Sequence, residues 1–187
     1  MTLSLKNIIS VFSTALILGC EQKALEIRYY PSDRESPEAN TEYIGLDTTK
    51  LNFGQIANKL REHDSVYTNL VLEFEDEQIK KRVVPYVYGY GCISENNMLK
   101  VRPDSILIDD NYHISELNRI LKKHYSNWGK NFYYSDSPEK ALVELTIDEN
   151  SDGKKIKDTL AELTRSFDKT RMELSDTIEL RIFFNHY

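Results

Sequence analysis

The chain has 187 residues, of which 40% are hydrophobic and 29% are charged, and its formal net charge at pH 7 is −6. This composition is typical of one folded domain or two small ones, and it excludes an intrinsically disordered chain. The excess of acidic residues argues against nucleic acid or an anionic lipid surface as a partner, because such surfaces select clusters of Lys and Arg.

The first twenty residues have the layout of a secretory signal. Lys6 precedes an apolar run at residues 8–18, and Gly19-Cys20 closes that run. The pattern resembles a bacterial lipoprotein signal peptide, residues 1–19, followed by a lipid-modified Cys20. An uncleaved membrane anchor is the alternative, but crossing a bilayer takes ~20 apolar residues. We therefore expect a lipid anchor at Cys20 that ties the chain to a bacterial membrane, with the folded part in the periplasm or outside the cell.

The chain contains two cysteines, Cys20 and Cys92. An acylated Cys20 cannot form a disulfide, so we expect no disulfide framework to hold the fold. Cys92 is then a single thiol. It is interpreted either as a small buried hydrophobic side chain or as a reactive thiol.

Residues 20–41 are polar, contain Pro31 and Pro37, and follow neither helical nor strand periodicity. This stretch is predicted to be a flexible tether between the lipid anchor and the folded part. Within it, residues 27–30 could form a short edge strand.

Residues 42–95 are predicted to form an N-terminal αβ unit. A strand at residues 42–46 precedes a helix that Asn52 and Gln55 open as a capping pair. The apolar face of that helix consists of Phe53, Ile56, Ala57 and Leu60, and the strand that follows carries Leu70, Leu72 and Phe74. Four acids within residues 73–77 indicate either a divalent cation site or a solvated strand edge.

Tyrosines alternate with small residues behind Pro85. Tyr86, Tyr88, Tyr90 and Cys92 fall on one face of a predicted strand, and Gly89 and Gly91 fall on the other. One interpretation is an aromatic face that binds a carbohydrate or a protein. The other is an edge strand whose rings cover a neighbouring helix.

From residue 105 onward the apolar pattern becomes regular. Residues 109–111 read Asp-Asp-Asn and predict the turn of a β-hairpin, because these residues tolerate the left-handed conformation. Ser115 is predicted to cap a helix whose apolar stripe is Leu117, Ile120, Leu121, His124, Tyr125 and Trp128. A strand, a helix and a last strand follow, with apolar stripes at Val143, Leu145 and Ile147, at Ile156, Leu160, Leu163 and Phe167, and at Ile178, Leu180, Ile182 and Phe184. The predicted fold class is α+β, with open sheets and helices packed on one face.

This order of β-hairpin, α, β, α, β resembles the periplasmic domain of the ExbD/TolR family of biopolymer-transport proteins. The resemblance covers about residues 105–184, and it rests on segments 106–114, 117–121 and 143–148 and on the helix after them. It implies an ExbD/TolR-like domain at residues 105–187 and a role accessory to biopolymer transport. Family members also carry a transmembrane helix whose aspartate works with a partner channel on the proton gradient, whereas the apolar run at residues 8–18 contains no acid.

The acidic turn at residues 148–153, Asp-Glu-Asn-Ser-Asp-Gly, fits the start of a calcium-binding loop. Position 12 of such a loop is Thr159 here, where calcium requires a bidentate Glu, and Lys154 and Lys155 follow the glycine. The alternative is a strand-to-helix connection in which Asp152 caps the helix. A calcium-binding or enzymatic lipoprotein that uses the turn at Asp148 is therefore the alternative function.

No recognised catalytic motif occurs in the chain. The histidines His63, His113, His124 and His186 lack metal-ligand spacing, and His124 lies on the apolar stripe of its helix, as a core histidine does. The chain has no G-x-S-x-G motif, no phosphate-binding loop and no C-x-x-C motif. We expect no catalytic residue, no metal and no cofactor. The favoured function is a non-enzymatic envelope lipoprotein that binds a protein partner or peptidoglycan.

Overall fold

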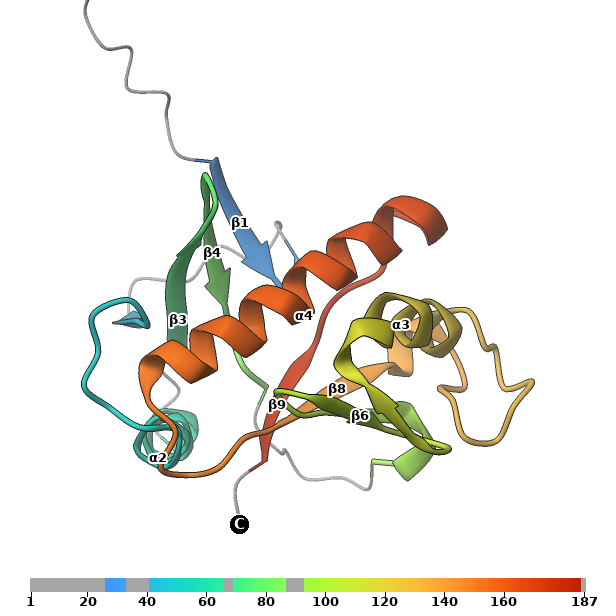
Figure 1. The fold of residues 1–187 in the computed structure, drawn as a ribbon, viewed down its shortest axis with the longest axis horizontal. Coiled ribbons are helices and arrows are strands. Elements are labelled where there is room, and N and C mark those ends of the chain that lie inside the picture. The colour runs from blue at the N-terminus through green and yellow to red at the C-terminus, as the bar shows by residue number, and fades with distance from the viewer. Residues whose placement is uncertain (1–25, 33–40, 66–68, 87–92, 186–187) are drawn as a thin grey trace, which may run out of the picture.

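The computed structural model describes residues 26–32, 41–65, 69–86 and 93–185, and these residues fold into two β-sheets and three α-helices (Figure 1). The elements in chain order are β1 (Glu26–Tyr30), β2 (Thr41–Gly45), α2 (Phe53–Ser65), β3 (Asn69–Asp76), β4 (Ile79–Val83), β5 (Met98–Val101), β6 (Ser105–Leu107), β7 (Asn111–His113), α3 (Leu117–Tyr125), β8 (Leu142–Thr146), α4 (Gly153–Leu174) and β9 (Ile182–Asn185). The α+β class is confirmed. No helix in these ranges is long and apolar enough to cross a membrane.

The first sheet has the strand order β1-β4-β3-β2. Strands β3 and β4 form an antiparallel hairpin, and β1 and β2 each add a parallel edge to it. The predicted capping pair opens α2: the Asn52 side chain accepts from the N–H of Gln55 at 2.8 Å, and the Gln55 side chain accepts from the N–H of Asn52 at 2.9 Å. The predicted apolar face of α2 is buried.

Part of the predicted tether belongs to this sheet, which corrects the assignment of residues 26–30. They form β1 and pair with β4 in parallel, and Tyr30 is fully buried. The edge strand considered for residues 27–30 is thus present, and its inward side chains include the polar Arg28 and Tyr30, which are held by hydrogen bonds to Asp168. Tether residues 20–25 and 33–40 lie outside the described residues, and Thr41 begins β2.

The second sheet has the strand order β7-β6-β5-β8-β9. The hairpin predicted around residues 109–111 is confirmed as β6 and β7, and the order of elements from residue 105 onward is the predicted one. Strand β5 was not predicted. It lies between the two predicted units, at the centre of the sheet, antiparallel to β6 and parallel to β8.

Two local predictions for the second half are wrong. Ser115 does not cap α3: it lies in a 3-10 turn, and its N–H donates to the ring of His113. Glu144 of β8, which alternates with the apolar stripe, is also buried: it is only 4% exposed and accepts hydrogen bonds from Thr146 and Asn185. The last strand is short, because residues 178–181 precede β9 rather than belong to it.

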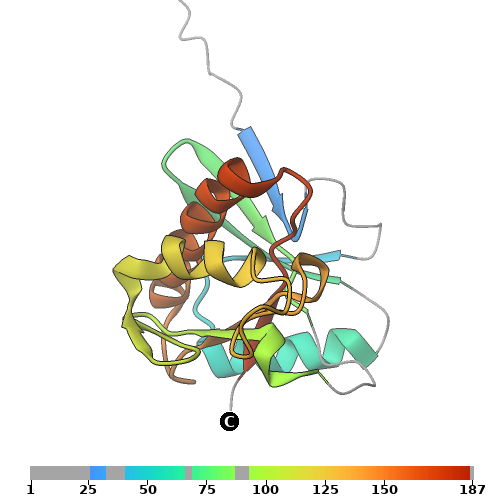
Figure 2. The same cartoon turned by 90° about the vertical axis from the view of Figure 1, so that its right-hand side faces the viewer.

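Helix α4 packs against both halves of the fold. It runs along the inner side of the first sheet and beside α3, which covers the second sheet (Figures 1 and 2). One continuous hydrophobic cluster therefore contains Phe74 of β3, Phe167 of α4 and Leu145 of β8. The division into a unit at residues 42–95 and a domain at residues 105–187 stays a prediction.

Candidate functional site

The connection between α3 and β8 exposes three large aromatic side chains. Phe132 is 83% exposed, Trp128 61% and Tyr133 54%. In Figure 1 this connection projects beyond α3, on the side of the molecule away from the first sheet. Such side chains are normally buried, because each can remove ~150–250 Å² from water. We call residues 126–137 the aromatic loop and treat it as the candidate binding surface.

A buried asparagine, Asn127, fixes the conformation of the aromatic loop. Its amide nitrogen donates to the carbonyl oxygens of Asn131, Tyr134 and Ser135 at 2.9–3.0 Å. Its amide oxygen accepts from the N–H of Asn131 at 2.9 Å. Asn127 is 6% exposed, so one side chain satisfies backbone groups that a helix or sheet would otherwise pair.

A second buried asparagine, Asn97, holds the return limb of the aromatic loop. Its side-chain oxygen accepts from the hydroxyl of Ser135 and from the N–H of Asp136, each at 2.9 Å. Asn96 donates to the carboxylate of Asp136 at 2.9 Å. Since residues 95–97 lead directly into β5, these bonds tie the aromatic loop to the central strand of the second sheet.

The backbone at the start of the aromatic loop is left-handed. Trp128 has φ +49° and Gly129 has φ +68°. Glycine adopts this conformation freely, whereas for a residue as large as Trp it is unfavourable by about 1 kcal/mol or more. The left-handed pair places Trp128 outside α3. The prediction that Trp128 continues the buried stripe of that helix is therefore wrong.

The exposed rings form a wedge rather than a flat platform. The rings of Phe132 and Tyr133 lie 5.8 Å apart between centroids and are almost perpendicular, at 79°. Lys130 is the only charged side chain among residues 126–135, and it is exposed. Beneath the wedge, Tyr134 is fully buried. Its hydroxyl donates to Asp109 at 3.0 Å, and the ammonium group of Lys123 lies 3.9 Å from its ring centroid.

His124 of α3 lies directly under the aromatic loop. It is fully buried, as the sequence predicted for a core histidine, and its Nδ1 accepts from the N–H of Ser135 at 3.3 Å. Its Nε2 has no hydrogen-bond partner. Burial lowers the pKa of His124 to about 4, against a weaker opposing effect of the backbone carbonyls of Asn97 and Leu142. The ring is therefore neutral at pH 7.

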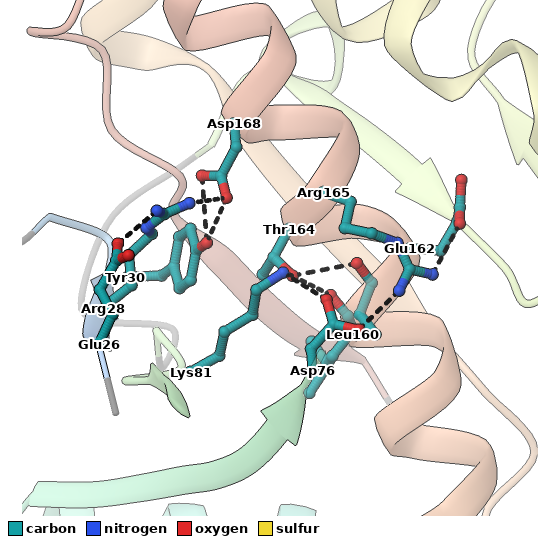
Figure 3. A network of polar contacts seen from close by, with 11 residues as sticks. Glu26, Arg28, Tyr30, Asp76, Lys81, Leu160, Glu162, Thr164, Arg165 and Asp168 are labelled. Atoms are coloured by element: carbon teal, nitrogen blue, oxygen red, sulfur yellow. Dashed lines mark hydrogen bonds and ion pairs between the residues drawn. The ribbon is translucent and has the colours of Figure 1, made fainter. Parts of the chain in front are cut away.

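A buried polar network joins the first sheet to α4 (Figure 3). Lys81 of β4, 1% exposed, donates to Asp76 at 2.7 Å and to the hydroxyl of Thr164 at 2.9 Å. Asp76 also accepts from Arg165 at 2.6 Å. Because Lys81 is buried and already bonded to two partners on the protein, this cluster serves to hold α4 rather than to react with a substrate.

The same face of α4 holds β1. Asp168 accepts from Arg28 at 2.6 Å and from the hydroxyl of Tyr30 at 2.9 Å (Figure 3). Burial, reinforced by the Asp168 carboxylate, raises the pKa of Tyr30 well above its usual range, so the phenol stays protonated and continues to donate.

The acidic run at residues 73–77 is neither a metal site nor a strand edge. Strand β3 lies inside the sheet, between β4 and β2. Glu73 pairs with Lys80 at 3.1 Å and with Arg82 at 2.8 Å, and Asp76 faces the opposite side towards Lys81. The acids of β3 thus match the cations of β4 as cross-strand pairs, which the sequence analysis did not consider.

At residues 148–153 the structure has the geometry of the capping alternative. Asp152 caps α4 by accepting from the N–H of Lys155 at 2.9 Å, and Asp148 accepts from the N–H of Asn150 at 2.8 Å. Within the described ranges, no three His, Cys, Asp or Glu side chains lie close enough together to hold a metal ion. A cleft of about 500 Å³ lies beside this turn, and its lining includes both cations and acids, Arg102, Lys155, Asp104, Asp148 and Glu149. Because the lining carries both signs of charge, the cleft favours neither an anionic nor a cationic ligand.

Several predicted site residues lie outside the described part of the chain: Cys20, Tyr88, Tyr90, Cys92 and His186. Tyr86 is described, and it forms an isolated parallel bridge with Phe183 of β9. His63 lies 2.8 Å from Glu42, and the ring of His113 lies 2.9 Å from the hydroxyl of Ser115. The described histidines His63, His113 and His124 lie on three different elements, α2, β7 and α3.

Comparison of the chain with models of known protein families, with curated proteins and with solved structures finds no match. The candidate surface thus rests on the geometry of the chain itself. Sequence reasoning missed this surface because residues 126–137 show neither helical nor strand periodicity. The available signal was a cluster of Asn, Ser and Gly around Trp128, Phe132 and Tyr133.

Proposed function

We propose that this protein is a non-enzymatic binding module of a bacterial envelope lipoprotein, and that the aromatic loop docks a folded protein partner. The observation that carries the proposal is the combination of exposure and order: Trp128, Phe132 and Tyr133 face solvent from a backbone that buried asparagines hold in place. A preordered loop loses little conformational entropy on binding.

The composition of the aromatic loop favours a protein partner. Residues 126–135 consist of Ser, Asn, Trp, Gly, Lys, Asn, Phe, Tyr, Tyr and Ser. Protein-recognising loops use the same types, because aromatic side chains provide large contact areas with few rotatable bonds, while Ser, Asn and Gly adapt their hydrogen bonds. Lys130 is the only charged side chain in residues 126–135, and the one acid of the loop, Asp136, is bonded to Asn96 and Lys140, which matches the depletion of charge at the centre of protein interfaces.

The shape of the wedge favours a protein partner that has an apolar pocket over a flat ligand such as a sugar chain. A sugar chain stacks on aromatic faces that lie in one plane, whereas the rings of Phe132 and Tyr133 are nearly perpendicular. A convex pair of rings fits an apolar pocket in a folded partner. Peptidoglycan is therefore the second outcome of the test below rather than the proposed ligand.

The non-enzymatic part of the proposal is supported by the state of the reactive groups. In the described residues, Lys81 is bonded to Asp76 and Thr164. The hydroxyl of Ser135 is bonded to Asn97 and to the carbonyl of Ser137, so it is not poised as a nucleophile. The lipid anchor at Cys20 and the ExbD/TolR-like character of residues 105–187 complete the proposal. They are supported by the N-terminal sequence pattern and by the element order from residue 105.

A photo-crosslinking amino acid placed at position 132 tests the docking surface in intact cells. We expect the full-length protein to yield one discrete adduct of higher mass, and we expect a Trp128→Ala change in the same chain to weaken that adduct. The matched control carries the crosslinker at position 27, since Ile27 is 46% exposed but lies on β1 of the first sheet, away from the aromatic loop. Equal adducts from both positions, or retention of the protein by purified peptidoglycan instead, would contradict the proposal.

A further inference from the structure

We infer that His124 is an acid-operated latch for the aromatic loop: protonation of its ring breaks the contact with Ser135, which holds the return limb together with the bonds of Asn97 and Asn127, and so increases the motion of the loop. This inference rests on the proposed function for its biological meaning, because it names the regulation of the same docking surface. Its physical content, the release of the aromatic loop by acid, stands on the geometry around His124 alone.

The hydrogen bond to Ser135 requires a neutral ring. An N–H of the backbone can only donate, so Nδ1 of His124 must carry a lone pair to accept from it at 3.3 Å. Protonation converts Nδ1 into a second donor, and two N–H groups then face each other in a buried site. The contact changes from attractive to repulsive. Because Ser135 belongs to the return limb of the aromatic loop, this limb is pushed away from the histidine.

No neighbouring charge stabilises a protonated ring. The elements packed around His124 present Tyr125 from α3, Tyr134 from the aromatic loop, the carbonyl of Asn97 from the turn before β5 and the carbonyl of Leu142 from β8. Asp109 and Lys123 contact Tyr134, through its hydroxyl and its ring respectively, rather than the histidine. The carbonyls of Asn97 and Leu142 favour the protonated ring, but burial disfavours it more strongly, and Nε2 has no hydrogen-bond partner while the loop is closed.

The aromatic loop is the part able to move in response. Helix α3, β5 and β8 belong to the packed core, whereas residues 126–137 have no helix or strand of their own apart from single turns. Opening of the loop lets water reach the imidazole. The charged ring is hydrated in the open form but not in the buried, closed form, so protonation favours opening.

The size of the effect follows from the two protonation states. The pKa of His124 is about 4 when the loop is closed and returns towards 6.5 when water reaches the ring. The closed form is fully favoured above pH 6.5, and that preference is lost as the pH falls from 6.5 to 4, because the open form binds the proton more tightly. A difference of this size changes the ratio of open to closed loop by up to ~300-fold.

Trp128 makes the latch measurable, because it is the only tryptophan of the chain and lies in the aromatic loop. We would record its fluorescence anisotropy decay in the full-length protein from pH 7.5 to pH 4, with far-UV circular dichroism as the check on the global fold. The expected result is faster local motion of Trp128 as the pH falls below about 6.5, before any loss of secondary structure. In H124Q, whose side chain can accept from Ser135 but cannot be protonated, the motion should not change with pH.

H113Q is the matched control, since His113 is exposed and contacts Ser115 rather than the aromatic loop. If H124Q does not fold, nuclear magnetic resonance of the wild-type chain replaces it. The imidazole signal of His124 and the indole signal of Trp128 must then titrate with one midpoint. Motion of Trp128 that does not depend on pH, or an acid response that persists in H124Q, would overturn the latch. An acid-released loop without any adduct at position 132 would remove only the docking proposal.

Discussion

Replacing Asp76 by Asn should destabilise the whole protein, because the buried polar network joins the first sheet to α4. The carboxylate of Asp76 bonds Lys81 at 2.7 Å and Arg165 at 2.6 Å, and the side chain of Lys81 is 2% exposed. Removal of one partner of a buried pair leaves the other charge without compensation, which is unfavourable by about 3–5 kcal/mol. For a chain of this length, the expected fall in Tm is roughly 6–20 °C.

The double variant Asp76→Asn with Lys81→Met should be closer to wild type than the sum of the two single changes. It removes both buried charges together, and Arg165 retains Glu162 as a partner at 3.1 Å. The matched control is Asp47→Asn. Asp47 pairs with Lys157 of α4, but its side chain is 38% exposed. Such an ion pair contributes about 0–1 kcal/mol.

Urea denaturation followed by two probes measures these changes. Circular dichroism reports all helices and strands, whereas Trp128 fluorescence reports the aromatic loop, which projects beyond α3 on the side away from the first sheet (Figure 1). If α4 makes one core of both sheets, the two probes give one transition, and Asp76→Asn shifts both by the same free energy. A Trp128 transition that stays in place while the other moves would refute this reasoning and would support two domains. A loss of less than about 1 kcal/mol in the free energy of unfolding of Asp76→Asn would also refute it.

Three further predictions concern other parts of the chain. Gly153→Ala should lower the free energy of unfolding despite the better helix propensity of Ala, since a Cβ there would lie 2.7 Å from the side chain of Thr49 and 3.0 Å from the carbonyl oxygen of Leu46; urea denaturation measures the change. A thermal melt of residues 21–187 should be the same with calcium and with chelator, because Asp152 and Asp148 already accept hydrogen bonds from their own turn; a rise of several degrees with calcium would restore the calcium loop. Labelled palmitate should mark the protein in bacteria through Cys20, and label retained by Cys20→Ala would disprove the lipid anchor.

The regular part of the fold was predictable because it follows hydrophobic periodicity. Helix α2 with its capping pair, the hairpin of β6 and β7, and the sequence α3, β8, α4 and β9 all carry apolar stripes of the correct period. Local hydrogen bonding and burial of one face determine such elements, so the chain alone contains the required information.

The elements that sequence reasoning missed, or left open as it did the edge strand at residues 27–30, depend on partners distant in the chain. Strand β1 is held by Asp168, which lies 140 residues after Arg28 and 138 after Tyr30, and β4 buries Lys81 on Asp76 and Thr164. No local pattern distinguishes such a buried polar side chain from a solvated one. The aromatic loop was missed for the same reason, because Asn127 and Asn97 reveal their roles only once the chain has folded around them.

The most direct test of the central claim is the affinity between this protein and the partner captured by the crosslinker at position 132. Aromatic side chains at the centre of an interface contribute about 2–4 kcal/mol when truncated to Ala. We predict that Phe132→Ala weakens binding by at least ~30-fold in titration calorimetry. Ile27→Ala, which changes an exposed side chain on β1 of the first sheet, away from the aromatic loop, should leave the affinity unchanged within about twofold. Equal affinities for wild type and Phe132→Ala would contradict the claim that the aromatic loop is the docking surface.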